Sequence, residues 1–324
     1  MREWFVAPRR LFGAAAATLV VTFNLWVSPS QAGDPFRPNS LYDMGEETEA
    51  AFRSFFELGN YPQAAEFLRL AETRESQDPL TYAMIASMAY VKQDWQSLGP
   101  YATKTREMAE NILASQPLRG NLYIAVGHLL EGADNLQRQG IVRGLPQALR
   151  KLQLVYNFLD KADAIDSEDP ELNLIKGYMD LMLAMALPFA NPADAIARLD
   201  KYAAPSSFAD WGIAIAYRDL EDYEKANEYA DIALASVPKH PELHYLKAQI
   251  LVKLGQRELA QDYFQTALAR SRQLPKVIVA QMFYEYCKNQ RKIDGINRDC
   301  DDLRDPIKED NDTWWGPETL PQLF

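Results

Sequence analysis

The chain has 324 residues, of which 48% are hydrophobic and 24% are charged, and its formal net charge is −11. This composition is that of a folded protein and differs from that of a disordered segment. The acidic balance, without clusters of Lys and Arg, argues against nucleic acid as a partner.

The first 32 residues have the pattern of an export signal. Three arginines precede an uncharged apolar run over 11–27, and Ser30 and Ala32 then supply the small residues that a signal peptidase reads. We therefore expect residues 1–32 to be a cleaved signal peptide and the protein to reach the periplasm or another extracytoplasmic compartment. Loss of the three Arg and one Glu in this segment would take the net charge from −11 to −13.

Two alternatives concern this segment. Its apolar run is slightly long for a signal, so an uncleaved membrane anchor is the competing interpretation, although Thr22 and Asn24 weaken it as a stable span. The pair Arg9-Arg10 partly resembles the twin-arginine export motif, but its flanks depart from that motif and favour the general secretory route. After cleavage, we expect no stable membrane insertion.

The rest of the chain is expected to be helical. Residues 33–45 carry Pro35 and Pro38 and predict an extended leader. From 46 to 290, apolar residues recur at helical spacing, and no long run of alternating β-branched residues interrupts them. This pattern predicts an all-α fold.

Two stretches near the C-terminus repeat each other at an offset of 34 residues. In order along the chain, Leu220, Glu224, Ala226, Tyr229, Ala233, Leu234 and Ala235 recur as Leu254, Glu258, Ala260, Tyr263, Ala267, Leu268 and Ala269. A fixed period of this length is typical of stacked helix–turn–helix units. The pattern resembles the tetratricopeptide repeat (TPR) family, and the resemblance implies an α-solenoid that binds partners and is not an enzyme.

Weaker copies of the repeat extend this pattern toward the N-terminus. The family places a turn residue, an Asp or Asn, and an aromatic between its two helices, as in Gly59-Asn60-Tyr61, Gln93-Asp94-Trp95 and Glu221-Asp222-Tyr223. Within a solenoid over 46–290, we predict about six repeats, at 46–78, 79–116, 117–169, 170–205, 206–239 and 240–274.

The third repeat is longer than the others and predicts an insertion. We expect a loop over 137–146, which contains Gly140 and Gly144, between two helices. Arginines within and beside it make this insertion basic on an acidic protein. It is interpreted as a solvated connection, with contact to an anionic ligand or a lipid surface as the alternative.

The C-terminal part contains both cysteines and an acidic tail. Cys287 and Cys300 are 13 residues apart, and an even pair in an exported protein predicts a disulfide bond. The alternative is two free thiols. Residues 291–324 predict an irregular acidic tail, in which Trp314 and Trp315 either cap the solenoid or occupy its groove.

No catalytic or cofactor motif is recognisable, so neither enzyme activity nor a cofactor is expected. His240 and His244 have a spacing that could hold a metal on one helix face. However, Pro241 predicts a helix start at this point, which leaves His240 at or before the cap, and no third ligand is visible. A metal-dependent enzyme would need a pocket where both histidines meet an acid.

The TPR resemblance also implies a binding surface, because the first helix of each repeat lines the concave face in that family. The residues carried over by position are Phe208, Trp211, Ile215, Arg218, Tyr245, Gln249, Lys253, Arg53, Phe56 and Tyr90. The competing interpretation is that aromatics such as Trp211 are simply core. A protein or peptide is the expected partner.

The alternative function is a carrier of a small molecule or lipid. The segment 177–187 is apolar except for Asp180 and is expected to be a fully buried helix, or else a Met-rich surface. An enclosed cavity lined by Met182, Met185 and Leu187 would favour the carrier, and an open polar and aromatic groove would favour the scaffold.

Overall fold

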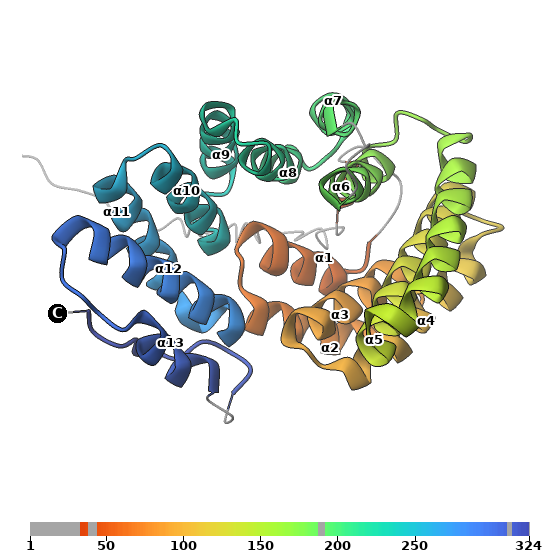
Figure 1. The fold of residues 1–324 in the computed structure, drawn as a ribbon. Coiled ribbons are helices and arrows are strands. Elements are labelled where there is room, and N and C mark those ends of the chain that lie inside the picture. Colours follow the sequence, from red (N-terminus) through yellow and green to blue (C-terminus); the bar gives the residue numbers. More distant parts are fainter. Residues whose placement is uncertain (1–32, 38–43, 187–191, 310–312, 324) are drawn as a thin grey trace, which may run out of the picture. The chain divides into compact units, whose positions relative to one another are not determined.

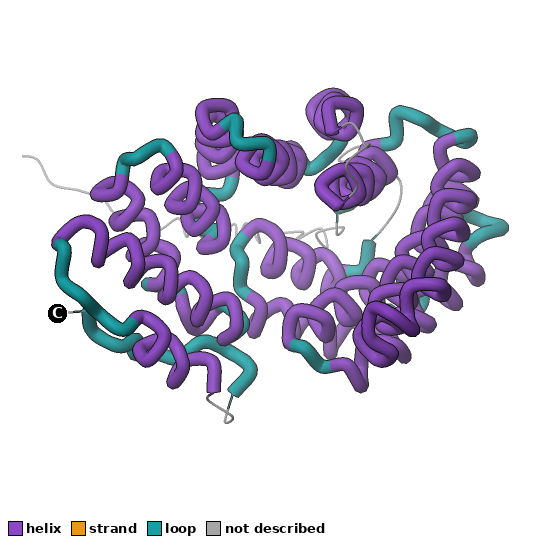
Figure 2. Tube along the Cα trace, viewed as in Figure 1, coloured by secondary structure: helices purple, strands orange, loops and turns teal. Residues whose placement is uncertain are grey.

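The computed structural model describes residues 33–37, 44–186, 192–309 and 313–323. Helices fill most of this part of the chain, and the only pairing of extended backbone within it is an isolated bridge between Pro275 and Trp315 (Figure 1 and Figure 2). The predicted all-α solenoid is therefore confirmed as the fold class. The expected signal peptide, residues 1–32, lies outside the described residues.

Consecutive helical segments pack in pairs, one pair in each of the six expected repeats. The first three pairs are α1 (Glu46–Phe52), continued by the π-helical turn η1 (Arg53–Glu57), with α2 (Tyr61–Arg74); α3 (Pro79–Lys92) with α4 (Trp95–Ile112); and the two halves of α5 (Pro117–Asp163). The next three are α6 (Pro170–Ala186) with α7 (Pro192–Tyr202), α8 (Ser206–Asp219) with α9 (Tyr223–Ser236), and α10 (Pro241–Lys253) with α11 (Arg257–Leu268). The 3-10 turn η2 (Ser271–Gln273), α12 (Lys276–Asp294) and α13 (Cys300–Glu309) follow.

The turns inside the repeats form for a local reason. In three of them a residue in the left-handed conformation precedes an Asn or Asp that caps the second helix, namely Gly59-Asn60, Gln93-Asp94 and Glu221-Asp222. Each capping oxygen accepts the backbone N–H three residues further on, at 3.2 to 3.3 Å. Shortly after these turns, small residues such as Ala64 and Ala226 are completely buried, because they let the paired helices approach closely.

The expected loop over 137–146 is helical in the structure. The α5 segment runs through it, and the helical backbone is interrupted at Gly140, where φ is 71° and ψ is 166°. The two halves then pack against each other, with Gln139 donating to Gln147 at 3.1 Å and Gly132 lying against Ala148. A glycine can take this backbone conformation, so one residue makes the turn for which we expected a longer loop.

Within residues 177–184, the Met-rich segment is only partly buried. Met179 and Leu181 are buried, but Met182 is 55% exposed, so the expectation of a fully buried helix is wrong at this position. Leu187 lies outside the described residues, and α6 ends at Ala186. No helix in the described part of the chain is long and apolar enough to cross a membrane.

The C-terminal cap is held by the predicted disulfide bond, which the structure confirms. It joins Cys287 on α12 to Cys300, the first residue of α13, and both are buried. Beyond α13, the backbone N–H of Lys276 donates to the carbonyl of Trp314 at 3.0 Å, beside the bridge between Pro275 and Trp315. The tail is thus docked at the start of α12, which favours the capping interpretation.

The first repeat directly contacts the fifth and sixth repeats. The ring centroids of Phe56 in η1 and Phe208 in α8 are 4.6 Å apart. The Tyr61 hydroxyl in α2 donates to the Glu242 carboxylate in α10 at 2.8 Å. Because of these contacts, helices that are distant in sequence enclose one apolar space.

Candidate ligand-binding cavity

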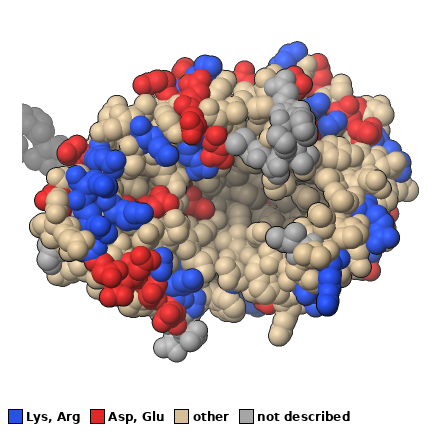
Figure 3. Space-filling view, in the orientation of Figure 1, with Lys and Arg blue, Asp and Glu red and all other residues tan. Residues whose placement is uncertain are grey.

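A cavity of about 510 Å³ lies among α1, η1, α2, α3, α5, α6, α8 and α10. Figure 3 shows the face hollowed at its centre, and uncharged residues cover most of the hollow. Of the 22 lining residues, nine are aromatic, and Glu242 is the one that carries a carboxyl or basic group. This volume and lining match a site for a hydrophobic ligand.

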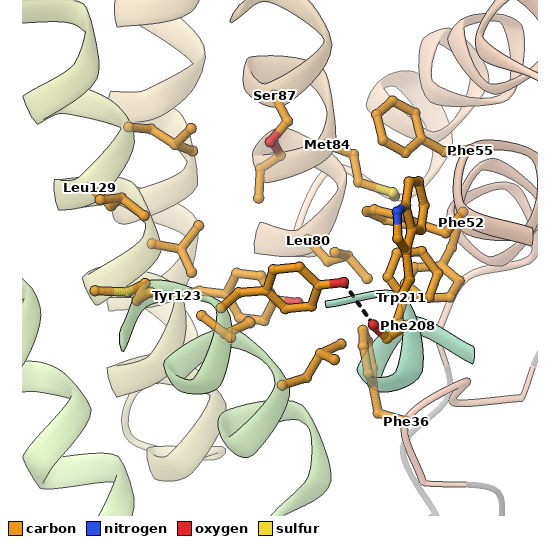
Figure 4. Close-up of a pocket in the computed structure, with 18 of the residues that line it drawn as sticks. Phe36, Phe52, Phe55, Leu80, Met84, Ser87, Tyr123, Leu129, Phe208 and Trp211 are labelled. Atoms are coloured by element: carbon orange, nitrogen blue, oxygen red, sulfur yellow. Dashed lines mark hydrogen bonds between the residues drawn. The ribbon is translucent and has the colours of Figure 1, made fainter. Parts of the chain in front are cut away.

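One wall of the cavity is a continuous row of aromatic rings. Their centroids are separated by 4.6 Å between Tyr61 and Phe55, 4.7 Å between Phe55 and Phe56, 4.6 Å between Phe56 and Phe208, and 5.8 Å between Phe208 and Trp211. Figure 4 shows Phe52, Phe55, Phe208 and Trp211 gathered on one side of the cavity. The π-helical turn η1 presents part of this wall, and such turns are frequent at functional sites.

The four hydroxyl groups that line the cavity all donate hydrogen bonds to the protein. Tyr178 donates to the carbonyl of Phe208 at 2.7 Å, the bond drawn in Figure 4. Tyr123 donates to Glu171, and Ser87 donates to the carbonyl of Ala83 at 2.8 Å. A ligand in the cavity therefore meets mainly carbon surface.

Among the described residues of this mainly apolar lining, Glu242 is the one with a carboxyl group. Glu242 is the second residue of α10, and Tyr61 donates a hydrogen bond to its Oε2. Burial raises the pKa of Glu242 to about 7, because the surroundings solvate the charged form poorly, while the bond from Tyr61 opposes this shift. This carboxyl is the natural attachment point for a polar group on a ligand.

Both histidines at the start of α10 contact other groups of the protein. His240 is 1% exposed, its ring lies 4.6 Å from that of Trp211, and burial lowers its pKa to about 3. His244 Nε2 lies 2.9 Å from the carbonyl oxygen of Pro238. Within the described residues, no group of three or more His, Cys, Asp or Glu could hold a metal ion. The metal-enzyme hypothesis gains no support here.

Four of the ten sequence-predicted site residues line this cavity. They are Phe56, Phe208, Trp211 and Ile215. Phe208, Trp211 and Ile215 lie at helical spacing on one side of α8, and all three line the cavity. Met182, which was expected in the carrier alternative, also lines the cavity.

The other predicted residues lie outside the cavity lining. Arg218 donates to Gln249 at 2.8 Å, and Gln249 donates to Glu285 at 2.9 Å. Lys253 lies over the Tyr223 ring, at 5.8 Å from its centroid. Tyr245 packs near Phe264, Arg53 pairs with Glu49 and Glu57, and Tyr90 lies against Trp95.

The sequence reasoning missed several lining residues. These are Phe36 in the leader, Phe52 and Phe55 in the first repeat, and the pair of Tyr61 and Glu242. The signal for the first repeat was the cluster of three large apolar rings within 52–56, which is visible in the sequence. The pairing of Tyr61 with Glu242 had no signal in the sequence, since 181 residues separate them.

Comparison with known proteins supports a TPR protein. Residues 241–274, which form α10 and α11, match the tetratricopeptide repeat family. No curated protein was found to match the sequence. TPR repeats generally mediate protein–protein interactions, and proteins built from them are generally not enzymes.

Proposed function

We propose that this protein is an exported, non-enzymatic scaffold that holds hydrophobic side chains of a protein or peptide partner in the aromatic cavity. The single observation that carries this proposal is an apolar, aromatic-lined cavity of about 510 Å³ in a repeat protein whose repeat type binds other proteins. Pockets that receive large anchor side chains are where the binding energy of protein interfaces concentrates. The role of Phe56, Phe208, Trp211 and Ile215 in this proposal is to form the wall that the anchors contact.

Filling the cavity tests this proposal. The substitution Ser87→Phe adds a ring inside the cavity, and Gln96→Phe adds the same ring on the exposed side of α4 as a control. A neutral apolar dye, N-phenyl-1-naphthylamine, should gain fluorescence with the wild-type protein and with Gln96→Phe, and much less with Ser87→Phe. Peptides selected on the wild-type protein should displace the dye. Absence of dye uptake by the wild-type protein would refute the proposed site.

A small-molecule or lipid carrier is the second candidate. It is favoured by the participation of Met182 and by a volume within the roughly 300–1,000 Å³ range of small-molecule pockets. Mass spectrometry of the protein purified from its native envelope separates the two candidates. A tightly bound organic molecule that co-purifies with the protein, and that peptides fail to displace, would favour the carrier.

Export is the other part of the proposal. The confirmed disulfide supports it, because such bonds persist in oxidising compartments. The backbone N of Gly33 lies 2.9 Å from Oε2 of Glu49. Cleavage after Ala32 would give Gly33 a free ammonium group, which would turn this bond into an ion pair. Mass spectrometry of the native N-terminus should find Gly33, and intact Met1 in a membrane fraction would contradict export by cleavage.

A further inference from the structure

The cavity contains one carboxyl group that lacks a cation. Among the described residues, Tyr61 is the group that donates a hydrogen bond to Glu242, and no Lys or Arg lines the cavity. Tyr61 is itself buried. Glu242 is partly buried as a residue, and its raised pKa indicates that its carboxyl group is poorly solvated. A carboxylate in such surroundings without a positive partner is costly, so this arrangement needs an explanation.

Elsewhere the same protein pairs a buried carboxylate fully. Glu171 is completely buried and accepts bonds from Arg37 and Arg119 as well as from the hydroxyl of Tyr123. Glu242 likewise accepts a hydrogen bond from a tyrosine, Tyr61, but no described arginine lines the cavity beside it. The contrast indicates a site that a positive group from outside the chain can complete.

The surroundings of Glu242 suit one kind of positive group. Tyr61 begins the aromatic row that reaches Trp211 through Phe55, Phe56 and Phe208. Ring faces attract an ammonium ion, and they also accommodate the methylene stem of a lysine side chain. An anionic group would be repelled by Glu242 in its ionised form, and the strongly acidic chain favours encounters with basic partners.

We propose that Glu242 is the specificity-determining residue of the cavity and that it receives a lysine ammonium carried by a hydrophobic segment of the partner. The proposal rests on the proposed function, because it names the chemistry of the anchor that the cavity takes. The lysine stem lies along the aromatic wall, its ammonium pairs with Glu242, and Tyr61 orients the carboxylate through Oε2.

A selection experiment tests the proposal without knowledge of the natural partner. A library of random heptapeptides on phage is selected against the wild-type protein, against Glu242→Gln and against Glu258→Gln. The control removes a carboxylate from the same second position of the helix α11, where the side chain is exposed. Selected peptides should be rich in hydrophobic residues with Lys for the wild-type protein and for Glu258→Gln. For Glu242→Gln the hydrophobic residues should remain and the enrichment of Lys should disappear.

A matched pair of synthetic peptides then measures the effect directly. Replacement of the selected Lys by norleucine, which keeps the stem and removes the ammonium, should weaken binding to the wild-type protein at least tenfold. The two peptides should bind Glu242→Gln with similar affinity, and thermal melting should show that this variant is folded. Equal binding of both peptides to the wild-type protein would overturn the role of Glu242 and leave the cavity intact. Peptides that never displace the apolar dye would instead overturn the proposed function.

Discussion

At the start of α10, burial moves the pKa values of two neighbouring side chains in opposite directions. It lowers the pKa of His240 to about 3 and raises that of Glu242 to about 7. The unfolded chain therefore binds more protons at His240 below pH 6.5, so this group makes stability rise with pH between about 3 and 6.5. The folded chain binds more protons at Glu242, so that group makes stability fall between about pH 4.5 and 7.

The substitution Glu242→Gln should isolate the second effect. Glutamine imitates the protonated carboxyl at every pH, and His240 is common to both proteins, so its contribution cancels in the difference. We expect the variant to gain stability over the wild-type protein as pH rises from 5 to 8, by up to about 3 kcal/mol at 1.4 kcal/mol per pKa unit. Chemical unfolding at pH 5, 6, 7 and 8 measures this difference. For Glu258→Gln we expect the stability difference from the wild-type protein to stay constant with pH. The same constant difference for Glu242→Gln would contradict the burial of the Glu242 carboxyl.

The aromatic residues Trp211 and Tyr245 were expected to share one binding patch, but the structure separates them. Trp211 lines the cavity, whereas Tyr245 packs near Phe264 outside it. We therefore expect Trp211→Ala to weaken binding of a cavity ligand by about 2 kcal/mol or more, as truncation of an anchor contact does. Tyr245→Ala should leave dye and peptide binding within about twofold, although it should lower the melting temperature because packing is lost. If Trp211→Ala and Tyr245→Ala weakened ligand binding equally, both residues would belong to one binding surface.

At the scale of helices and turns, the sequence was most informative where the cause of structure is local. Asn60, Asp94 and Asp222 were placed correctly between paired helices, because an Asn or Asp cap acts within three residues of itself. The expected loop over 137–146 was wrong because the two glycines in it gave no local signal of which one turns the chain. Gly140 and Gly144 look alike in sequence, yet only Gly140 turns the chain, and Gly144 lies inside a helix against Asn135.

A pair of glycine substitutions tests this account of α5. At Gly140 the backbone conformation belongs essentially to glycine, so Gly140→Ala should destabilise the protein by about 1–3 kcal/mol, although the space around it is open. Gly132 is helical, and an added Cβ would meet Lys151 at an ordinary 3.5 Å. Gly132→Ala should therefore be neutral or stabilising, by up to roughly 1 kcal/mol. Urea unfolding of both variants decides, and equal effects would mean that the turn is not strained for alanine.

At the scale of the whole molecule, the sequence could predict the part of the wall that α8 contributes, but not how distant repeats close the cavity. Phe208, Trp211 and Ile215 share a stripe because helical periodicity acts within one helix. The approach of Phe56 to Phe208 depends on the small rotations that accumulate over the intervening repeats, which no local pattern encodes. The cavity is therefore a property of the folded chain that the sequence pattern does not predict.

The leader provides a second long-range connection, through Arg37. Its guanidinium makes two bonds of 2.7 Å to Asp169 and one of 2.9 Å to Glu171, and it also pairs with Asp34. Asp169 and Glu171 are buried, so removal of Arg37 would take the guanidinium away from Asp169 and leave Glu171 with Arg119. The adjacent residue Phe36 lines the cavity, and its ring centroid lies 5.1 Å from that of Phe52. The ion pairs should thus hold part of the cavity wall in place.

The substitution Arg37→Ala should consequently destabilise the protein by about 3–5 kcal/mol, the usual cost of breaking a buried pair. Arg53→Ala is the matched control, because Arg53 pairs with Glu49 and Glu57 in contact with solvent, where an ion pair contributes about 0–1 kcal/mol. If the ion pairs of Arg37 hold the neighbouring Phe36 in the cavity wall, Arg37→Ala should also weaken dye binding under conditions where the variant is still folded. This effect would be indirect, because Arg37 does not line the cavity. Equilibrium unfolding and dye titration of both variants measure these effects. If Arg37→Ala loses stability and binds the dye normally, Phe36 is held by its ring contacts, and the leader does not determine the shape of the site.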